Sequence, residues 1–304
     1  MTSVRSVVSG IASNDRVGPL LASTGIGRGL VQRVAGGEAP GDVMASVHDL
    51  ADAGRIVSLE RHWGDGSSVD IDGVIADYET VIGLLGSSGL GSISEVLVPA
   101  QLLTVARGPE ALNEVCAVAR DFGVSVLIAT GAPGGVDAMI AVVQRQRAIG
   151  REVGIGLQSL LRRTERDCAG VAGRVRLSKT CSGPVLTDAG RFGHDIEVDK
   201  SYVRCAKALL ARGDEVWPSF ATHDPRLVEI VASLAIRYGR GMGHYEFAMY
   251  LGRAEHLQQR LVDSGESVRV CVPFGPEWFG RLVGGFAERP SALTSVVRAL
   301  LPGS

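Results

Sequence analysis

Six polar side chains lie in or just after short β-rich runs in the second half of the sequence, where we expect strands to end, and their types suit the binding of a cofactor. They are Gln158, Arg176, Lys179, Thr222, His223 and Glu246. Arginine and lysine bind phosphate, and a glutamine amide can both donate and accept at the edge of a heteroaromatic ring. We therefore expect these residues to hold a polyanionic or heteroaromatic cofactor. Each has a structural alternative, because arginine and glutamate at strand ends often form ion pairs and a histidine can hold a loop.

Glu60 and His62 follow the first apolar run and are candidates for catalysis. An imidazole titrates near neutral pH, so His62 could accept a proton from an amine substrate. This step matters because only a neutral amine nitrogen has a lone pair that can push a hydride from the neighbouring carbon. A histidine that only holds a loop is the alternative.

The pattern of the surrounding chain predicts a barrel that would position these side chains. Eight β-rich runs recur at 56–60, 94–98, 124–129, 153–158, 174–178, 216–221, 244–249 and 267–272. Between them lie segments with apolar residues at helical spacing and a glycine near the end. This alternation predicts an α/β fold, a parallel (βα)8 barrel of the TIM type over residues 51–304, with helices in residues 1–50 packed on it as one domain. The active site would lie at the carboxyl ends of the strands.

The main rival fold is a doubly wound open sheet, which would carry a glycine-rich phosphate-binding turn after its first strand. The segment GIGRG at 25–29 has no strand before it, and GSSGLG at 86–91 reads as a loop. Neither segment matches the fingerprint, so the barrel is favoured.

The composition argues against several classes of protein. The 304 residues carry a net charge of −2 and scattered basic residues, which argues against a nucleic-acid partner. Charges interrupt the first residues too often for a signal peptide or a membrane span, so we expect a cytoplasmic protein. Five widely separated cysteines argue against a disulfide framework and against a metal site.

Five motifs, in order along the chain, resemble those of the monofunctional bacterial proline dehydrogenases. They are GLQSLLRRTERD at 156–167, RLSK at 176–179, SFATHDPRLVEI at 219–230, HYEFAMYLG at 244–252 and VRVCVPFGPEWFGRLVGGFAERPSAL at 268–293. The family is built on a distorted (βα)8 barrel, and it oxidises proline to a cyclic imine by moving a hydride to N5 of FAD.

The resemblance implies that the cofactor is FAD and that the six polar residues match family positions that bind it. Arg176 would lie near N5 of the flavin, and Thr222 and His223 would lie toward the far end of the dinucleotide. Thr180 and Cys181 stand where the family has a glycine and an alanine whose backbone approaches the cofactor. These two residues are therefore also expected at the cofactor.

The positions that the family uses for its substrate are changed in this chain. Val98 and Ala129 replace a lysine and an aspartate, and Cys271 replaces a tyrosine. Gly284 and Gly285 replace the two arginines that clamp the carboxylate of proline. Charged hydrogen bonds contribute about 1.5 to 3 kcal/mol each, so loss of the clamp should weaken the binding of a free amino acid by orders of magnitude.

We therefore predict an FAD-dependent oxidoreductase that acts on an amine, imino or hydrazine compound and gives an imine or hydrazone. A carboxyl-masked or carrier-protein-tethered substrate, of the kind used in specialised metabolism, would suit the space at the two glycines. Arg281 on the same predicted helix could supply a relocated positive charge.

Three alternative functions stay open. They are an ordinary proline dehydrogenase, a flavin barrel acting on a carbon substrate such as a folate, and a flavin-free pseudoenzyme or binding protein. The electron acceptor could be a quinone, oxygen or a carrier protein. The protein could also form a homo-oligomer.

Overall fold

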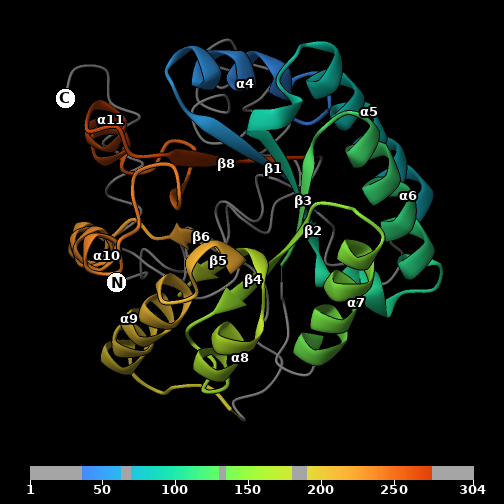
Figure 1. Ribbon diagram of the computed structural model, residues 1–304. Helices are drawn as coiled ribbons and strands as arrows, with labels where there is room; N and C mark the ends of the chain where they lie inside the picture. Colours follow the sequence, from blue (N-terminus) through green and yellow to red (C-terminus); the bar gives the residue numbers. More distant parts are fainter. Residues whose placement is uncertain (1–35, 63–69, 130–134, 180–189, 276–304) are drawn as a thin grey trace, which may run out of the picture.

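The computed structural model describes residues 36–62, 70–129, 135–179 and 190–275, and its strands form a closed barrel (Figure 1). The strands are β1 Ile56–Arg61, β2 Ser94–Pro99, β3 Ser125–Ala129, β4 Val153–Gln158, β5 Gly173–Ser178, β6 Val216–Ala221, β7 Glu246–Tyr250 and β8 Val268–Phe274. Every neighbouring pair is parallel, and β8 pairs with β1 to close the ring. The predicted (βα)8 barrel is confirmed.

Helices alternate with the strands and surround the barrel (Figure 1). They are α4 Val43–Asp52, α5 Ile71–Ser87, α6 Gly108–Asp121, α7 Val136–Ala148, α8 Thr164–Gly170, α9 Asp195–Leu210, α10 Pro225–Arg237 and α11 Glu255–Asp263. Two of them begin with an aspartate cap, because Asp70 accepts the Gly73 N–H of α5 and Asp224 accepts the Arg226 N–H of α10. Of the predicted N-terminal helices only α4 is described, since residues 1–35 lie outside the described ranges.

The main apolar core lies between the strands and the helices. Successive side chains of a strand point to opposite faces, so Val153, Ile155 and Leu157 of β4 pack outward against helices while Gly154 and Gln158 face inward. Tyr78 of α5 is completely buried in this layer and donates to the Leu97 carbonyl at 2.7 Å. The barrel is therefore stabilised mainly from outside its strands.

The interior of the barrel is charged rather than apolar. Barrels of this type are usually filled by layers of valine, isoleucine and leucine. Here the inward positions of five strands carry buried or half-buried ionic side chains. They are Glu60 of β1, Glu95 of β2, Arg174 and Arg176 of β5, Glu246 of β7 and Arg269 of β8.

The boundaries of β7 differ from the prediction. The expected strand at 244–249 begins two residues later, at Glu246, and ends at Tyr250. Tyr245 resembles a strand residue because it is buried and packs edge-on against Phe220 and Phe247, but it lies in a bend before the strand. Glu246 therefore opens β7, and the expectation that it closes its strand is wrong.

Within the described ranges, no helix has the length and apolar character that crossing a bilayer requires.

Two helix glycines should respond in opposite ways to alanine. Gly83 of α5 has open space where an added methyl group would lie, so Gly83→Ala should raise the free energy of unfolding by about 0.5 to 1 kcal/mol. At Gly108 the same methyl would overlap the Leu102 carbonyl oxygen, so Gly108→Ala should lower the free energy of unfolding by about 1 to 3 kcal/mol. Urea denaturation of both variants measures the difference. Equal stability of the two variants would contradict the close approach at Gly108.

Candidate active site

The carboxyl ends of β4, β5 and β6 bring most of the expected cofactor residues to one rim of the barrel. Gln158 ends β4, Lys179 directly follows β5 and Thr222 directly follows β6. The pairing of Gln158 with Ser178 and of Ser178 with Ala221 aligns these three ends. The rim therefore carries an amide, an ammonium and a hydroxyl on adjacent strands.

Lys179 is held in place by acidic side chains of the neighbouring helices. Its Nζ lies 2.5 Å from the Asp199 carboxylate of α9 and 3.9 Å from the Asp224 carboxylate at the start of α10. The Lys179 carbonyl also accepts the Leu160 N–H at 3.0 Å. Its side chain is 26% exposed, so it is only partly covered at the rim.

Thr222 and His223 are fixed by backbone hydrogen bonds. The Thr222 hydroxyl oxygen accepts the Asp224 N–H at 3.1 Å, and His223 Nε2 accepts the Tyr250 N–H at 3.0 Å. The His223 and Tyr250 rings stack with centroids 6.1 Å apart. Because Nε2 accepts, a neutral His223 ring carries its proton on Nδ1.

The first strand places Glu60 at the same end of the barrel, next to a residue that the sequence analysis missed. The Tyr250 hydroxyl, from the end of β7, donates to Glu60 Oε2 at 3.1 Å. Glu60 and His62 are both buried, and the His62 N–H donates to the Phe274 carbonyl at 2.8 Å. Tyr250 thus touches His223 on the expected cofactor side and Glu60 on the expected substrate side.

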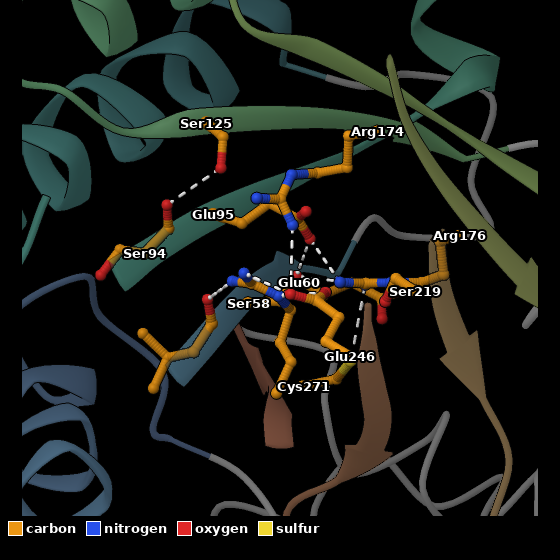
Figure 2. A network of polar contacts seen from close by, with 12 residues as sticks. Ser58, Glu60, Ser94, Glu95, Ser125, Arg174, Arg176, Ser219, Glu246 and Cys271 are labelled. Carbon is orange, nitrogen blue, oxygen red and sulfur yellow. Dashed lines mark hydrogen bonds and ion pairs between the residues drawn. The ribbon is translucent and has the colours of Figure 1, made fainter. Parts of the chain in front are cut away.

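Arg176 extends from β5 into the barrel interior, where it meets Glu95 of β2 (Figure 2). Its Nη2 donates to Glu95 Oε1 at 2.6 Å, and the Ser58 hydroxyl donates to the same oxygen at 2.7 Å. Longer contacts join Arg176 to Ser58 at 3.3 Å, to Ser219 at 3.4 Å and to Cys271 Sγ at 3.6 Å. Arg176 and Glu95 are both buried.

Glu246 belongs to a second buried group rather than to the rim. Its two oxygens accept from Arg269 Nε at 2.7 Å and Arg269 Nη2 at 2.9 Å, and Arg174 Nη1 lies 3.1 Å away. Arg269 also donates to the Val57 carbonyl at 2.7 Å. Burial alone would raise the pKa of Glu246, but the charge and hydrogen bonds of Arg269, with Arg174, hold that pKa well below its ordinary value.

Cys271 and Ala129, two expected substrate-side residues, lie on the inner face of the barrel. Burial raises the pKa of the Cys271 thiol to about 11, although the nearby charge of Arg176 acts in the opposite direction. Cys271 is therefore a neutral thiol at pH 7. Ala129 ends β3 beside Gly156, where the register pairs the two residues.

Val98 does not lie where the sequence analysis expected it. It is 1% exposed and belongs to the apolar core between strands and helices. Glu95 faces the barrel interior, so the period of two places Leu97 and Pro99 on the inner face and Val98 on the outer face. The expectation that Val98 lines a substrate pocket is corrected.

Five expected site residues lie outside the described ranges. They are Thr180, Cys181, Arg281, Gly284 and Gly285.

Sequence reasoning missed Glu95, Ser58, Arg269 and Tyr250. A charged residue inside an apolar strand is the signal that could have found Glu95 in SEVLV and Arg269 in VRVCV. Tyr250 was missed because the predicted strand ended at residue 249, one residue before it.

A groove of about 540 Å³ lies elsewhere, on the outer face of α9 and α10. Its lining includes Val203, Lys207, Arg226, Glu229, Ile230 and Leu234. Because it is formed by helix side chains rather than strand ends, we do not assign the active site to it.

Comparison with known proteins gives a family match for part of the barrel. The family model for proline dehydrogenase matches residues 192–278, which span α9 to β8 and include Thr222, His223, Glu246, Tyr250 and Cys271. This chain is a relative of the proline dehydrogenases. The family resemblance predicted from the five motifs is confirmed.

Individual relatives of known name match about half of the chain. The proline dehydrogenase of Deinococcus radiodurans is 31% identical over 152 residues, which cover 50% of this chain and 48% of that protein. Proline dehydrogenase 2 of Bacillus subtilis is 28% identical over 145 residues, which cover 47% of each chain. The alignments thus span less than half the length of either proline dehydrogenase.

The barrel also resembles part of a larger protein of known structure. Proline utilization A (PutA) from Bdellovibrio bacteriovorus, inactivated by N-propargylglycine, superposes with a TM-score of 0.75 at 18% identity. The superposition covers 88% of this chain and 34% of the larger protein. At this identity the likeness supports the fold alone.

The buried Glu246 group gives this proline dehydrogenase relative a predictable response to acid. The unfolded chain protonates this carboxylate below its ordinary pKa of 4.5, whereas the folded protein resists protonation because the folded pKa is depressed. The stability that Glu246 contributes is therefore present at neutral pH and is lost as the pH falls below 4.5 toward the folded pKa. Glu246→Gln should lower the free energy of unfolding by about 3 kcal/mol at pH 7, and this deficit should shrink at lower pH.

Urea denaturation at about pH 7 and about pH 3 measures this change in the deficit. Glu79→Gln on the exposed face of α5 is the matched control and should change little at either pH. A deficit for Glu246→Gln that stays constant across this range would contradict the depressed pKa.

Proposed function

We propose that this chain is an FAD-dependent oxidoreductase that removes a hydride from a carbon next to nitrogen, on a single barrel domain. The observation that carries the proposal is the set of donors on the adjacent ends of β4, β5 and β6, within a relative of the proline dehydrogenases. When bound, FAD would accept the hydride at N5.

The described residues fit a flat, phosphate-bearing cofactor in their chemistry and in their size. The inward positions near the carboxyl ends include Ala129, Gly156, Ala221 and Ala248, and small side chains at such positions would suit a planar ring. Arg176 has five N–H groups, of which the four contacts described above use four. Among contacts with the described residues, one N–H on Nη2 is therefore not used and could donate to an acceptor.

Each rim residue has a distinct role in this proposal. Lys179 would bind a phosphate through its ammonium, and Gln158 would bind the ring edge. Thr222 and His223, already oriented by backbone hydrogen bonds, would border the far end of the dinucleotide.

The substrate would bind beside Glu60 and Tyr250. A buried carboxylate that accepts a hydrogen bond from a phenol can also accept a proton from a protonated amine. The resulting neutral nitrogen has a lone pair that supports hydride loss from the neighbouring carbon. His62 is a second proton acceptor on the same strand end.

We further propose that the substrate has a masked carboxylate, or carries it elsewhere, as in an ester, an amide or a carrier-tethered acyl group. Ala129 and Cys271 support this because neither can pair with the charges of a zwitterion. Gly284 and Gly285 support it from the sequence, since two glycines cannot form a guanidinium clamp. An ordinary proline dehydrogenase is the second candidate, because relatives that match half of the chain carry that name.

Anaerobic titration of the purified, FAD-loaded protein tests both candidates. We expect proline methyl ester, in which the carboxylate is masked, to bleach the flavin absorbance faster than free proline. Rapid bleaching by free proline would favour the ordinary dehydrogenase, and a protein that binds no flavin would favour the pseudoenzyme.

Loss of the Lys179 charge should weaken FAD binding. A charged hydrogen bond contributes about 1.5 to 3 kcal/mol, so Lys179→Gln should raise the dissociation constant for FAD by about 10-fold to 100-fold. Quenching of flavin fluorescence during titration of the apoprotein measures this constant. Lys207→Gln, on the exposed outer face of α9, is the matched control and should bind FAD as the wild type does.

A further inference from the structure

Glu95 is a buried carboxylate inside an otherwise apolar strand. It is the second residue of β2, in the run SEVLVP, and its side chain is completely buried. Taking an ionised carboxylate out of water costs several kcal/mol unless charge and hydrogen bonds compensate. Its contacts therefore indicate what the charge does in this protein.

Those contacts concentrate on one oxygen. Glu95 Oε1 accepts from Arg176 Nη2 at 2.6 Å and from the Ser58 hydroxyl at 2.7 Å, while Oε2 has no hydrogen-bond partner among the described residues. Ser58 Oγ in turn accepts from Arg176 Nη1 at 3.3 Å. Arg176 is thus held on two of its nitrogens by one carboxylate and one hydroxyl across the barrel interior (Figure 2).

Glu95 is the one carboxylate that pairs with Arg176 within the described part of the chain. The contacts of Arg176 to Ser219 and Cys271, at 3.4 and 3.6 Å, are longer and neutral. Charge-assisted bonds are about twice as strong as neutral ones, so Glu95 dominates the orientation of the guanidinium. It also offsets part of the positive charge of Arg176.

We propose that Glu95 is a positioning residue that orients Arg176 toward the flavin and lowers the reduction potential of that flavin by offsetting the arginine charge. This inference rests on the proposed function and on the expectation, implied by the family resemblance, that Arg176 lies near N5 of the flavin. A net positive charge near the ring favours the reduced flavin, because reduction adds negative charge to it. Without the Glu95 carboxylate, less of the Arg176 charge is offset.

The other buried carboxylate provides a comparison within the same barrel. Glu246 carries an equal charge, but its hydrogen bonds go to Arg269 and Arg174 and not to Arg176. If burial of any carboxylate in the interior sets the potential, the two should act alike. If the pairing with Arg176 matters, Glu95 should have the larger effect.

The first experiment measures the midpoint potential of the bound flavin by equilibration with a reference dye. Glu95→Gln removes the charge and should shift the equilibrium toward reduced flavin by about tenfold, which is about 30 mV for a two-electron couple. Glu95→Asp keeps the charge and should stay close to wild type, and Glu246→Gln should shift the potential less than Glu95→Gln does. An unchanged potential in Glu95→Gln, or equal shifts in both glutamine variants, would overturn the proposal.

The second experiment needs no flavin, so it tests the pairing of Glu95 with Arg176 independently of the flavin potential. A double-mutant cycle in the apoprotein compares Glu95→Gln, Arg176→Gln and the double variant by urea denaturation. We expect the double variant to lose less stability than the two single losses added together, because each single change leaves one buried partner unpaired. Additive losses would overturn the positioning of Arg176 by Glu95. Coupling in a protein that binds no FAD would instead refute the flavin function and the proposed effect on its potential.

Discussion

Burial of charge inside the barrel is the constraint on which the rest of this structure depends. Arg174, Arg176 and Arg269 point into an interior that usually holds aliphatic side chains, and Glu95 and Glu246 compensate them. Each charge is tolerated only because its partner arrives from a different strand. Closure of the barrel is therefore what brings these charges together in pairs.

The two groups of charges have different positions relative to the rim. The group around Glu246 joins the beginnings of β5, β7 and β8 and so stabilises the part of the barrel opposite the rim. The group around Arg176 lies closer to the candidate site, since Arg176 is three residues before Lys179. The same kind of interaction can thus stabilise the fold in one group and prepare a binding site in the other.

Tyr250 connects the two sides of the rim. Its backbone N–H orients His223, and its hydroxyl donates to Glu60. A residue placed in this way couples the geometry of the cofactor side to that of the substrate side. The family model covers Tyr250 and His223 but begins at residue 192, far after Glu60 in the sequence. The contact between Tyr250 and Glu60 therefore joins a segment that the family model matches to one that it does not match.

The sequence by itself determined the alternation of strands and helices, the barrel, the family resemblance and the polar residues at the strand ends. These features follow from local periodicity and short motifs, which depend on neighbours along the chain. Only the tertiary structure decided that Glu95 pairs with Arg176, 81 residues away, that Val98 faces the helices and that Glu246 lies at the start of its strand. The period of two gives alternating faces, but closure of the barrel and the register between strands decide which face is inside and which charges meet there.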